Sequence, residues 1–219
     1  IEHYKKKSVE YQGRYGSTSD DGENYSAGVR YSKDGKYICY PTDVNYGDDS
    51  IEFRLNMQKV GKTEEPVKID SSVTSYTILD NNKILYKKAG NDTLYINDKK
   101  GNKEKIASDV EYFYLDSDQK NIVWSESNGD GTINVCQQDV ALKKEKKTLA
   151  KDVDSFHTSS DLKYILVNEQ DIIYMIENFG EKQKIASGVE DVSYDDLDNG
   201  GIYYTKSSEE TLSAEDVVE

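Results

Sequence analysis

The sequence predicts an all-β, β-propeller-like fold of about five four-stranded blades, and two observations carry this prediction. The first is a six-residue segment that recurs at residues 68–73, 105–110, 148–153 and 184–189. The valines that end these copies are 37, 43 and 36 residues apart. The second is a series of short segments between the copies, in which apolar and polar residues alternate as they do in half-buried strands. A four-stranded sheet about every 40 residues is typical of a blade, whose two faces are covered only when blades stack.

The repeat that begins at residue 73 shows the order of the expected strands and turns. Residues 73–78 alternate and include β-branched and aromatic side chains, which predicts the first strand. Residues 80–83, Asp-Asn-Asn-Lys, predict a polar turn, and residues 84–86, Ile-Leu-Tyr, predict the second strand. Residues 93–96 predict the third strand. A lysine-rich turn then leads to a fourth strand in the next six-residue segment.

We expect a single domain over residues 1–219, with blades near residues 29–65, 66–103, 104–145, 146–182 and 183–206. The last copy holds only two clear strands, at residues 189–193 and 202–205. The run at residues 8–16 alternates like a strand, so we expect residues 9–15 to pair near residues 202–204 and to complete the last blade. Such a closure would remove the open edges of the ring.

The composition excludes several classes of protein. The chain carries 28 Lys and Arg against 42 Asp and Glu, a net charge of −14, which repels a nucleic-acid backbone. No stretch of about 18 apolar residues is present, so the sequence predicts no transmembrane helix within this chain. An aromatic content of 11%, with 18 tyrosines, argues against a disordered chain.

The cysteines and many tyrosines fall in strand-like runs. Cys39 and Cys136 lie two repeats apart, beyond the reach of a disulfide, so we expect both thiols to be reduced and buried. Tyrosine is a favoured strand residue, and most tyrosines are expected to pack rather than to bind. Core-like positions are predicted for Tyr76, Tyr112, Tyr114, Tyr194 and Tyr204.

One hairpin carries a resemblance to known propellers. Residues 31–40, Tyr-Ser-Lys-Asp-Gly-Lys-Tyr-Ile-Cys-Tyr, resemble the Ser-x-Asp-Gly-Lys-x-Ile hairpin of Tol-B-like and WD-repeat-like propellers, and residues 159–165 resemble a degenerate copy. The repeat is also similar to the extracytoplasmic propeller-like domains of bacterial membrane-anchored proteins of unknown function. This resemblance implies a cell-surface location, with an anchor outside this chain.

Three kinds of site can be compared with the residues of this chain. Glu126, Asn128 and Asp130 place oxygen ligands at alternate positions of a glycine-containing loop, which imitates the start of a calcium loop, although an ordinary hairpin turn explains them as well. Ser155 and His157 share a strand face, but no Gly-x-Ser-x-Gly motif accompanies them, so no catalytic residue is predicted. No pair of acids stands out as the carboxylates of a glycosidase.

The sign of the charge differs between the kinds of turn. The turns between third and fourth strands are rich in lysine, at Lys59, Lys62, residues 99–105, residues 143–147, Lys182 and Lys184. The turns between second and third strands, and the links between blades, are acidic. We therefore hypothesise one lysine-rimmed face and one acidic binding face, the latter formed by Asp43, Asp48, Asp92, Asp109, Asp130 and Asp152.

These observations predict a non-enzymatic extracytoplasmic binding or scaffold domain. The alternative is a carbohydrate-active or cell-wall-active propeller enzyme. The expected partners are a protein or a cell-wall glycan, and not nucleic acid, and we expect a monomer. No cofactor is predicted beyond the calcium alternative.

Overall fold

The computed structural model describes residues 28–47, 51–98 and 100–206, and nearly all of its regular structure is β-strand. These residues fall into two compact units. Unit 1 holds the residues up to Phe113 together with Trp124–Ser127, and unit 2 holds Tyr114–Val123 and the residues from Asn128 onward. Among the described residues, no helix is long and apolar enough to span a membrane.

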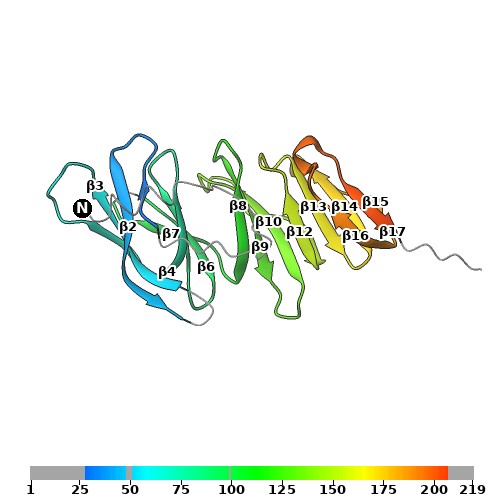
Figure 1. The fold of residues 1–219 in the computed structure, drawn as a ribbon, viewed down its shortest axis with the longest axis horizontal. Coiled ribbons are helices and arrows are strands. Elements are labelled where there is room, and N and C mark those ends of the chain that lie inside the picture. Colours follow the sequence, from blue (N-terminus) through cyan, green and yellow to red (C-terminus); the bar gives the residue numbers. More distant parts are fainter. Residues whose placement is uncertain (1–27, 48–50, 99, 207–219) are drawn as a thin grey trace, which may run out of the picture. The chain divides into compact units, whose positions relative to one another are not determined.

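The first seven strands form one antiparallel sheet in chain order (Figure 1). They are β1 (Arg30–Tyr31), β2 (Tyr37–Tyr46), β3 (Ile51–Lys59), β4 (Val67–Ile78), β5 (Ile84–Lys88), β6 (Thr93–Asn97) and β7 (Lys103–Ala107). The first half of β4 pairs with β3 and its second half pairs with β5. The sheet is therefore two successive four-stranded meanders that share the long strand β4.

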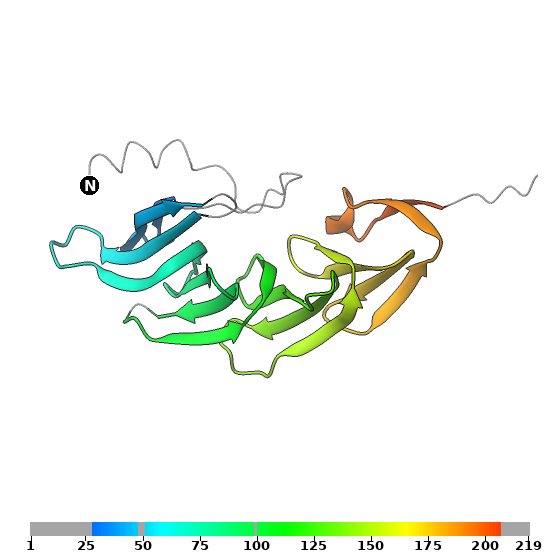
Figure 2. The same cartoon turned by 90° about the horizontal axis from the view of Figure 1, so that it is seen from below.

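The later repeats form separate sheets. A second sheet has the order β11-β10-β9-β8, from β8 (Val110–Leu115), β9 (Asn121–Ser127), β10 (Ile133–Asp139) and β11 (Lys147–Val153). A third runs β12 (Ser155–Thr158), β13 (Tyr164–Glu169), β14 (Ile172–Glu177) and β15 (Lys182–Ala186). Strands β16 (Val189–Ser193) and β17 (Tyr203–Lys206) form a two-stranded sheet, with the 3₁₀ helix η1 (Leu197–Asn199) between them. Figure 2 shows the same meanders from below.

These sheets confirm the all-β, propeller-like fold that the repeat predicts. The expected strand at residues 8–16 lies outside the described residues. The single domain, the blade limits and the closure of the ring stay predictions.

The residue before each recurrent valine explains how one repeat passes into the next. Ser72, Asp109, Asp152 and Gly188 all have a left-handed backbone, with φ of 54°, 57°, 53° and 68°. Asp, Asn and Gly tolerate this conformation better than other residues, because a larger or branched side chain collides with the following carbonyl. The recurrence in the sequence therefore marks the turn between consecutive repeats.

The Ser-x-Asp hairpin has the same geometry in both of its copies. The Ser32 hydroxyl donates to the Asp34 carboxylate (2.8 Å) and accepts the backbone N–H of Tyr37 (2.9 Å). The Ser159 hydroxyl likewise donates to Asp161 (2.8 Å) and accepts the backbone N–H of Tyr164 (2.9 Å). Both serines are buried, so the motif satisfies polar groups inside a tight turn.

Each unit has its own buried core. The core of unit 1 includes Phe53, Leu55, Val73, Tyr76 and Tyr86. The cores of unit 2 centre on the side chains of Val135, Val153, Phe156, Ile165, Val167 and Ile176, and of Leu166, Ile173 and Leu197.

The tyrosine and cysteine predictions have mixed outcomes. Tyr76 is buried, but the prediction of a core position is wrong for Tyr112 and Tyr204, which are 44% and 39% exposed. Both lie on strands at the edge of their sheets, where a missing neighbour leaves side chains uncovered. Cys39 and Cys136 are free and buried in different sheets, which confirms that prediction, and burial raises the pKa of Cys39 to about 12.

Candidate functional site

In unit 1 the links between consecutive repeats lie at the same end of the sheets as the second turns, which join the second and third strands of each repeat. The backbone N–H of Asp109 donates to Asn91 (2.8 Å), in the second turn of the preceding repeat. The Asp109 carbonyl accepts the N–H of Ser127 (2.8 Å), at the second turn of its own repeat. The N–H of Val110 donates to the Asp92 carbonyl (3.1 Å). Main-chain hydrogen bonds therefore join two second turns and the link between them into one array.

The predicted acids of unit 1 differ in how far their charge is compensated. Asp43 forms an ion pair with Arg54 (3.0 Å), and Asp92 forms one with Lys87 (3.2 Å). The carboxylate of Asp109 has no ion-pair partner among the described residues. Asp48 lies outside them.

Asp130 and Asp152 of unit 2 lie in a side-chain network at the corresponding turn. Asp130 accepts hydrogen bonds from the N–H and the hydroxyl of Thr132 (3.0 and 2.7 Å), which lower its pKa. Asp152 accepts a hydrogen bond from the Asn128 amide (3.1 Å), and its own N–H donates to Asn134 (3.2 Å). The Asn134 amide in turn donates to Asn128 (2.6 Å). These bonds fix the loop and leave both carboxylates at the surface.

The suggested metal ligands have partners within the protein. Glu126 accepts a hydrogen bond from the indole of Trp124 (2.9 Å), and Asn128 and Asp130 belong to the network just described. Among the described residues, no group of three His, Cys, Asp or Glu side chains is placed to hold a metal ion. A metal at Glu126, Asn128 and Asp130 stays a prediction.

Ser155 and His157 do not bond to each other. The Ser155 hydroxyl accepts a hydrogen bond from the Asn168 amide (3.0 Å), which also donates to the Tyr194 hydroxyl (3.2 Å). The imidazole of His157 stacks on the ring of Tyr194, with centroids 3.5 Å apart and planes 17° apart. Burial lowers the pKa of His157. The cluster attaches the segment after β16 to the sheet of β12–β15.

A buried carboxylate in unit 1 was not foreseen from the sequence. Asp70 accepts hydrogen bonds from the ammonium groups of Lys88 (2.8 Å) and Lys103 (2.9 Å), from the Tyr86 hydroxyl (3.0 Å) and from the N–H of Ser71 (2.8 Å). Burial alone would raise the pKa of Asp70, but the hydrogen bonds from Lys88, Lys103, Ser71 and Tyr86 together outweigh it and lower the pKa to about 2. Asp70 is therefore ionised and shared between two cations.

A fully buried amide lies beside this network. Asn97 has no exposed surface, and neither its amide nitrogen nor its amide oxygen completes a hydrogen bond among the described residues. It lies beside Tyr86, whose pKa is raised by burial and by Asp70 and lowered by Asn97. The Asn97 amide therefore belongs to the buried polar cluster of Tyr86 and Asp70.

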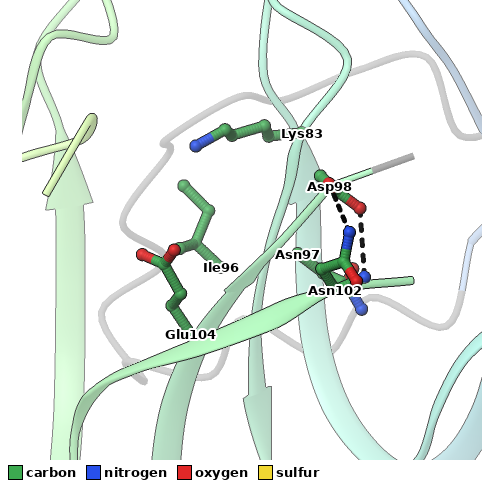
Figure 3. A pocket seen from close by; sticks show the side chains of 6 residues that line it. All are labelled: Lys83, Ile96, Asn97, Asp98, Asn102 and Glu104. Atoms are coloured by element: carbon green, nitrogen blue, oxygen red, sulfur yellow. Dashed lines mark hydrogen bonds between the residues drawn. The ribbon is translucent and has the colours of Figure 1, made fainter. Parts of the chain in front are cut away.

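Asn97 also lines a small pocket of about 90 Å³ (Figure 3). The other lining residues are Lys83, Ile96, Asp98, Asn102 and Glu104. Asp98 accepts hydrogen bonds from the backbone and the side chain of Asn102 (3.0 and 2.9 Å), which fix the third turn. The residues that line the pocket thus include one cation, two anions, two asparagines and one apolar side chain.

The sequence did carry a signal for Asp70. The six-residue segment places Asp70 where the other copies have Ala107, Ala150 and Ala186. A charged residue at a position that is otherwise a small, buried alanine points to a local partner. No comparable signal marks Asn97, because the end of a strand is an ordinary place for asparagine.

No family model matches the chain, and no curated protein matches it. Several solved structures resemble it in fold. The β-propeller domain of the Trilobed protease from Pyrococcus furiosus is 14% identical, with a TM-score of 0.47 over 73% of this chain and 56% of that one. TolB from Acinetobacter baumannii is 14% identical, with a TM-score of 0.45 over 75% and 44%. Porphyromonas gingivalis dipeptidyl peptidase 4 is 10% identical, with a TM-score of 0.47 over 72% and 32%. The matches span only about a third to just over half of these longer chains.

Proposed function

We propose that this chain is a non-enzymatic binding or scaffold domain, displayed outside the cytoplasm, that holds a basic protein segment against the acidic loops where links and second turns meet. The observation that carries the proposal is the hydrogen-bonded array around Asp109. A loop that is fixed before binding loses less conformational entropy when a partner docks. The exposed carboxylates then supply charge complementarity.

The state of the carboxylates supports binding over catalysis. The shifted carboxylates among the described residues all have a lowered pKa, and they are Asp34, Asp70, Asp98, Asp118, Asp130 and Asp161. A glycosidase needs one carboxyl group whose pKa is raised, so that it can donate a proton near neutral pH. The hydrogen bonds that lower these pKa values belong mostly to turns and ion pairs.

A triple variant tests the proposal without changing the backbone. Asp92, Asp109 and Asp152 have left-handed φ values. Asparagine tolerates that conformation and carries no electric charge. Asp92→Asn, Asp109→Asn and Asp152→Asn together should weaken the binding of a lysine-rich peptide about tenfold, since each exposed ion pair contributes about 0.5 kcal/mol. Affinity for the same peptide should fall as salt rises.

A matched variant removes the same charge elsewhere. Asp118→Asn, Glu145→Gln and Glu181→Gln change exposed acids in first and third turns. Calorimetric titration of both variants with the peptide decides the matter. Equal weakening in the two variants would show a general charge effect and would refute the acidic loops as the binding surface.

A further inference from the structure

One lysine of unit 1 already lies within the acidic loops. The ammonium of Lys87 forms an ion pair with Asp92 (3.2 Å) and donates to the main-chain carbonyls of Val110 (3.3 Å) and Glu111 (3.2 Å). Asp92 belongs to the second turn of this repeat, whereas Val110 and Glu111 begin β8 in the next repeat. A carboxylate and two carbonyls from two repeats therefore hold one alkylammonium group, directly after the link at Asp109.

The fold does not require a lysine at this position. Lys87 pairs with the residue that lies two positions after the recurrent valine. The residues at the same place in the next two repeats are uncharged. The Ser125 hydroxyl accepts the backbone N–H of Tyr112 (3.2 Å), and the Asn168 amide donates to the Ser155 hydroxyl (3.0 Å). An uncharged side chain that bonds to the neighbouring strand therefore serves at this position.

The contacts of Lys87 are of a kind that another cation can replace. Their lengths of 3.2–3.3 Å exceed the roughly 2.7–2.9 Å of a strong charge-assisted hydrogen bond. The side chain of Asp92 is 53% exposed, so water screens the ion pair, and exposed pairs contribute little to stability. The ammonium of a partner's lysine can therefore take this place at a small cost to the fold.

We propose that Lys87 is a built-in competitor for the acidic loops, which holds the place of a lysine of the basic partner until that partner displaces it. This inference rests on the proposed function and concerns the regulation of the same site. A group on the same chain competes at a high effective concentration, even when each of its contacts is weak. Lys87 therefore lowers the affinity of the loops for every basic segment and excludes segments that carry few charges.

A double-mutant cycle with the lysine-rich peptide tests the proposal. Lys87→Gln removes the charge and should strengthen peptide binding about threefold, the equivalent of one exposed ion pair. In the background of Asp92→Asn the same change should leave the affinity nearly unchanged, because the carboxylate for which Lys87 competes is gone. As a matched control, Lys100→Gln removes the same charge from an exposed residue of a third turn and should not strengthen binding.

A second measurement does not depend on the peptide. Lys87→Ala removes the competing ammonium and its aliphatic stem, so n-butylammonium, which reproduces the lysine side chain, should bind in their place. Nuclear magnetic resonance should show saturable binding in the millimolar range, with shifts at the backbone signals of Val110 and Glu111. The wild type should show no such shifts, and Asp92→Asn in addition to Lys87→Ala should weaken the binding severalfold.

The possible outcomes separate this inference from the proposed function. Peptide binding that the triple variant weakens, but that is equal in the wild type and Lys87→Gln, would overturn the competitor role and leave the proposed function standing. Equal strengthening by Lys87→Gln with and without Asp92 would show a general charge effect and would overturn it as well. Absence of butylammonium binding to Lys87→Ala would overturn the replaceable ammonium site whatever the peptide does. Absence of peptide binding to both the wild type and Lys87→Gln would instead refute the proposed function.

Discussion

Replacing Asp70 by asparagine removes the anion that Lys88 and Lys103 share, at nearly constant volume. The two ammonium groups then lie close together with no carboxylate between them. The pKa of Asp70 falls from its ordinary value of 3.8 to about 2, a preference of about 2 kcal/mol for the ionised form in the folded state. Breaking a fully buried pair costs about 3–5 kcal/mol.

The exposure of the lysines places the effect of Asp70→Asn below this range. The side chain of Lys88 is 23% exposed and that of Lys103 is 45% exposed, so water screens part of the interaction. We expect Asp70→Asn to lower the free energy of unfolding by about 2 kcal/mol at pH 7. For a chain of this size the melting temperature should fall by about 4–8 °C.

The pH dependence identifies the cause. Because the pKa of Asp70 is lower in the folded state, its stabilisation is present at pH above about 4 and is lost as the pH falls toward 2. Urea unfolding of both proteins should therefore show a difference in the free energy of unfolding at pH 7 that disappears near pH 2.5. A control, Asp118→Asn, removes an exposed ion pair with Lys120 and should leave the free energy of unfolding nearly unchanged. A difference that stays the same at both pH values would refute the role of the Asp70 charge.

Three further predictions concern other parts of the chain. Deletion of residues 1–16 should lower the melting temperature by several degrees if they pair with β17, and an unchanged value in a thermal melt would exclude that closure. The mass of the unreduced protein should show two thiols, at Cys39 and Cys136, and thiol reagents should label them only in denaturant; a deficit of two protons would show a disulfide. Because burial lowers the pKa of His157, stability should decline as the pH falls below about 6.5, and His157→Phe should reduce that decline between pH 7.5 and 5.5; an equal decline in both proteins would argue against it.

Local rules explain why the strands could be predicted from the sequence. Alternation marks the strands, and residues with a left-handed backbone mark the links, as at Asp109 and Asp152. Both signals are contained in a few neighbouring residues. The same rules cannot show that β4 passes through its link as one long strand, because that depends on pairing with β3 and β5 at once.

The candidate sites were harder to predict because they depend on pairs distant in the sequence. Asp70 meets Lys103 across 33 residues, and His157 meets Tyr194, which follows β16. Exposure at Tyr112 and Tyr204 follows from their place at sheet edges, which alternation does not reveal. Strand pattern gives the face of a side chain, but only the order of strands decides what covers that face.

At the acidic loops the backbone conformation limits the type of residue but does not require a charged side chain. Asp43, Asp92, Asp109 and Asp152 all have a positive φ, where asparagine and glycine would serve the backbone as well or better. Gly188 meets the same demand at the last link without any charge. The fold therefore requires a small residue with a tolerant backbone at these positions and does not require a carboxylate. Asp43 and Asp92 use their charge in ion pairs with Arg54 and Lys87, whereas Asp109 has no ion-pair partner among the described residues. The backbone does not explain the charge at Asp109, and the proposed binding of a basic partner would give it a physical purpose.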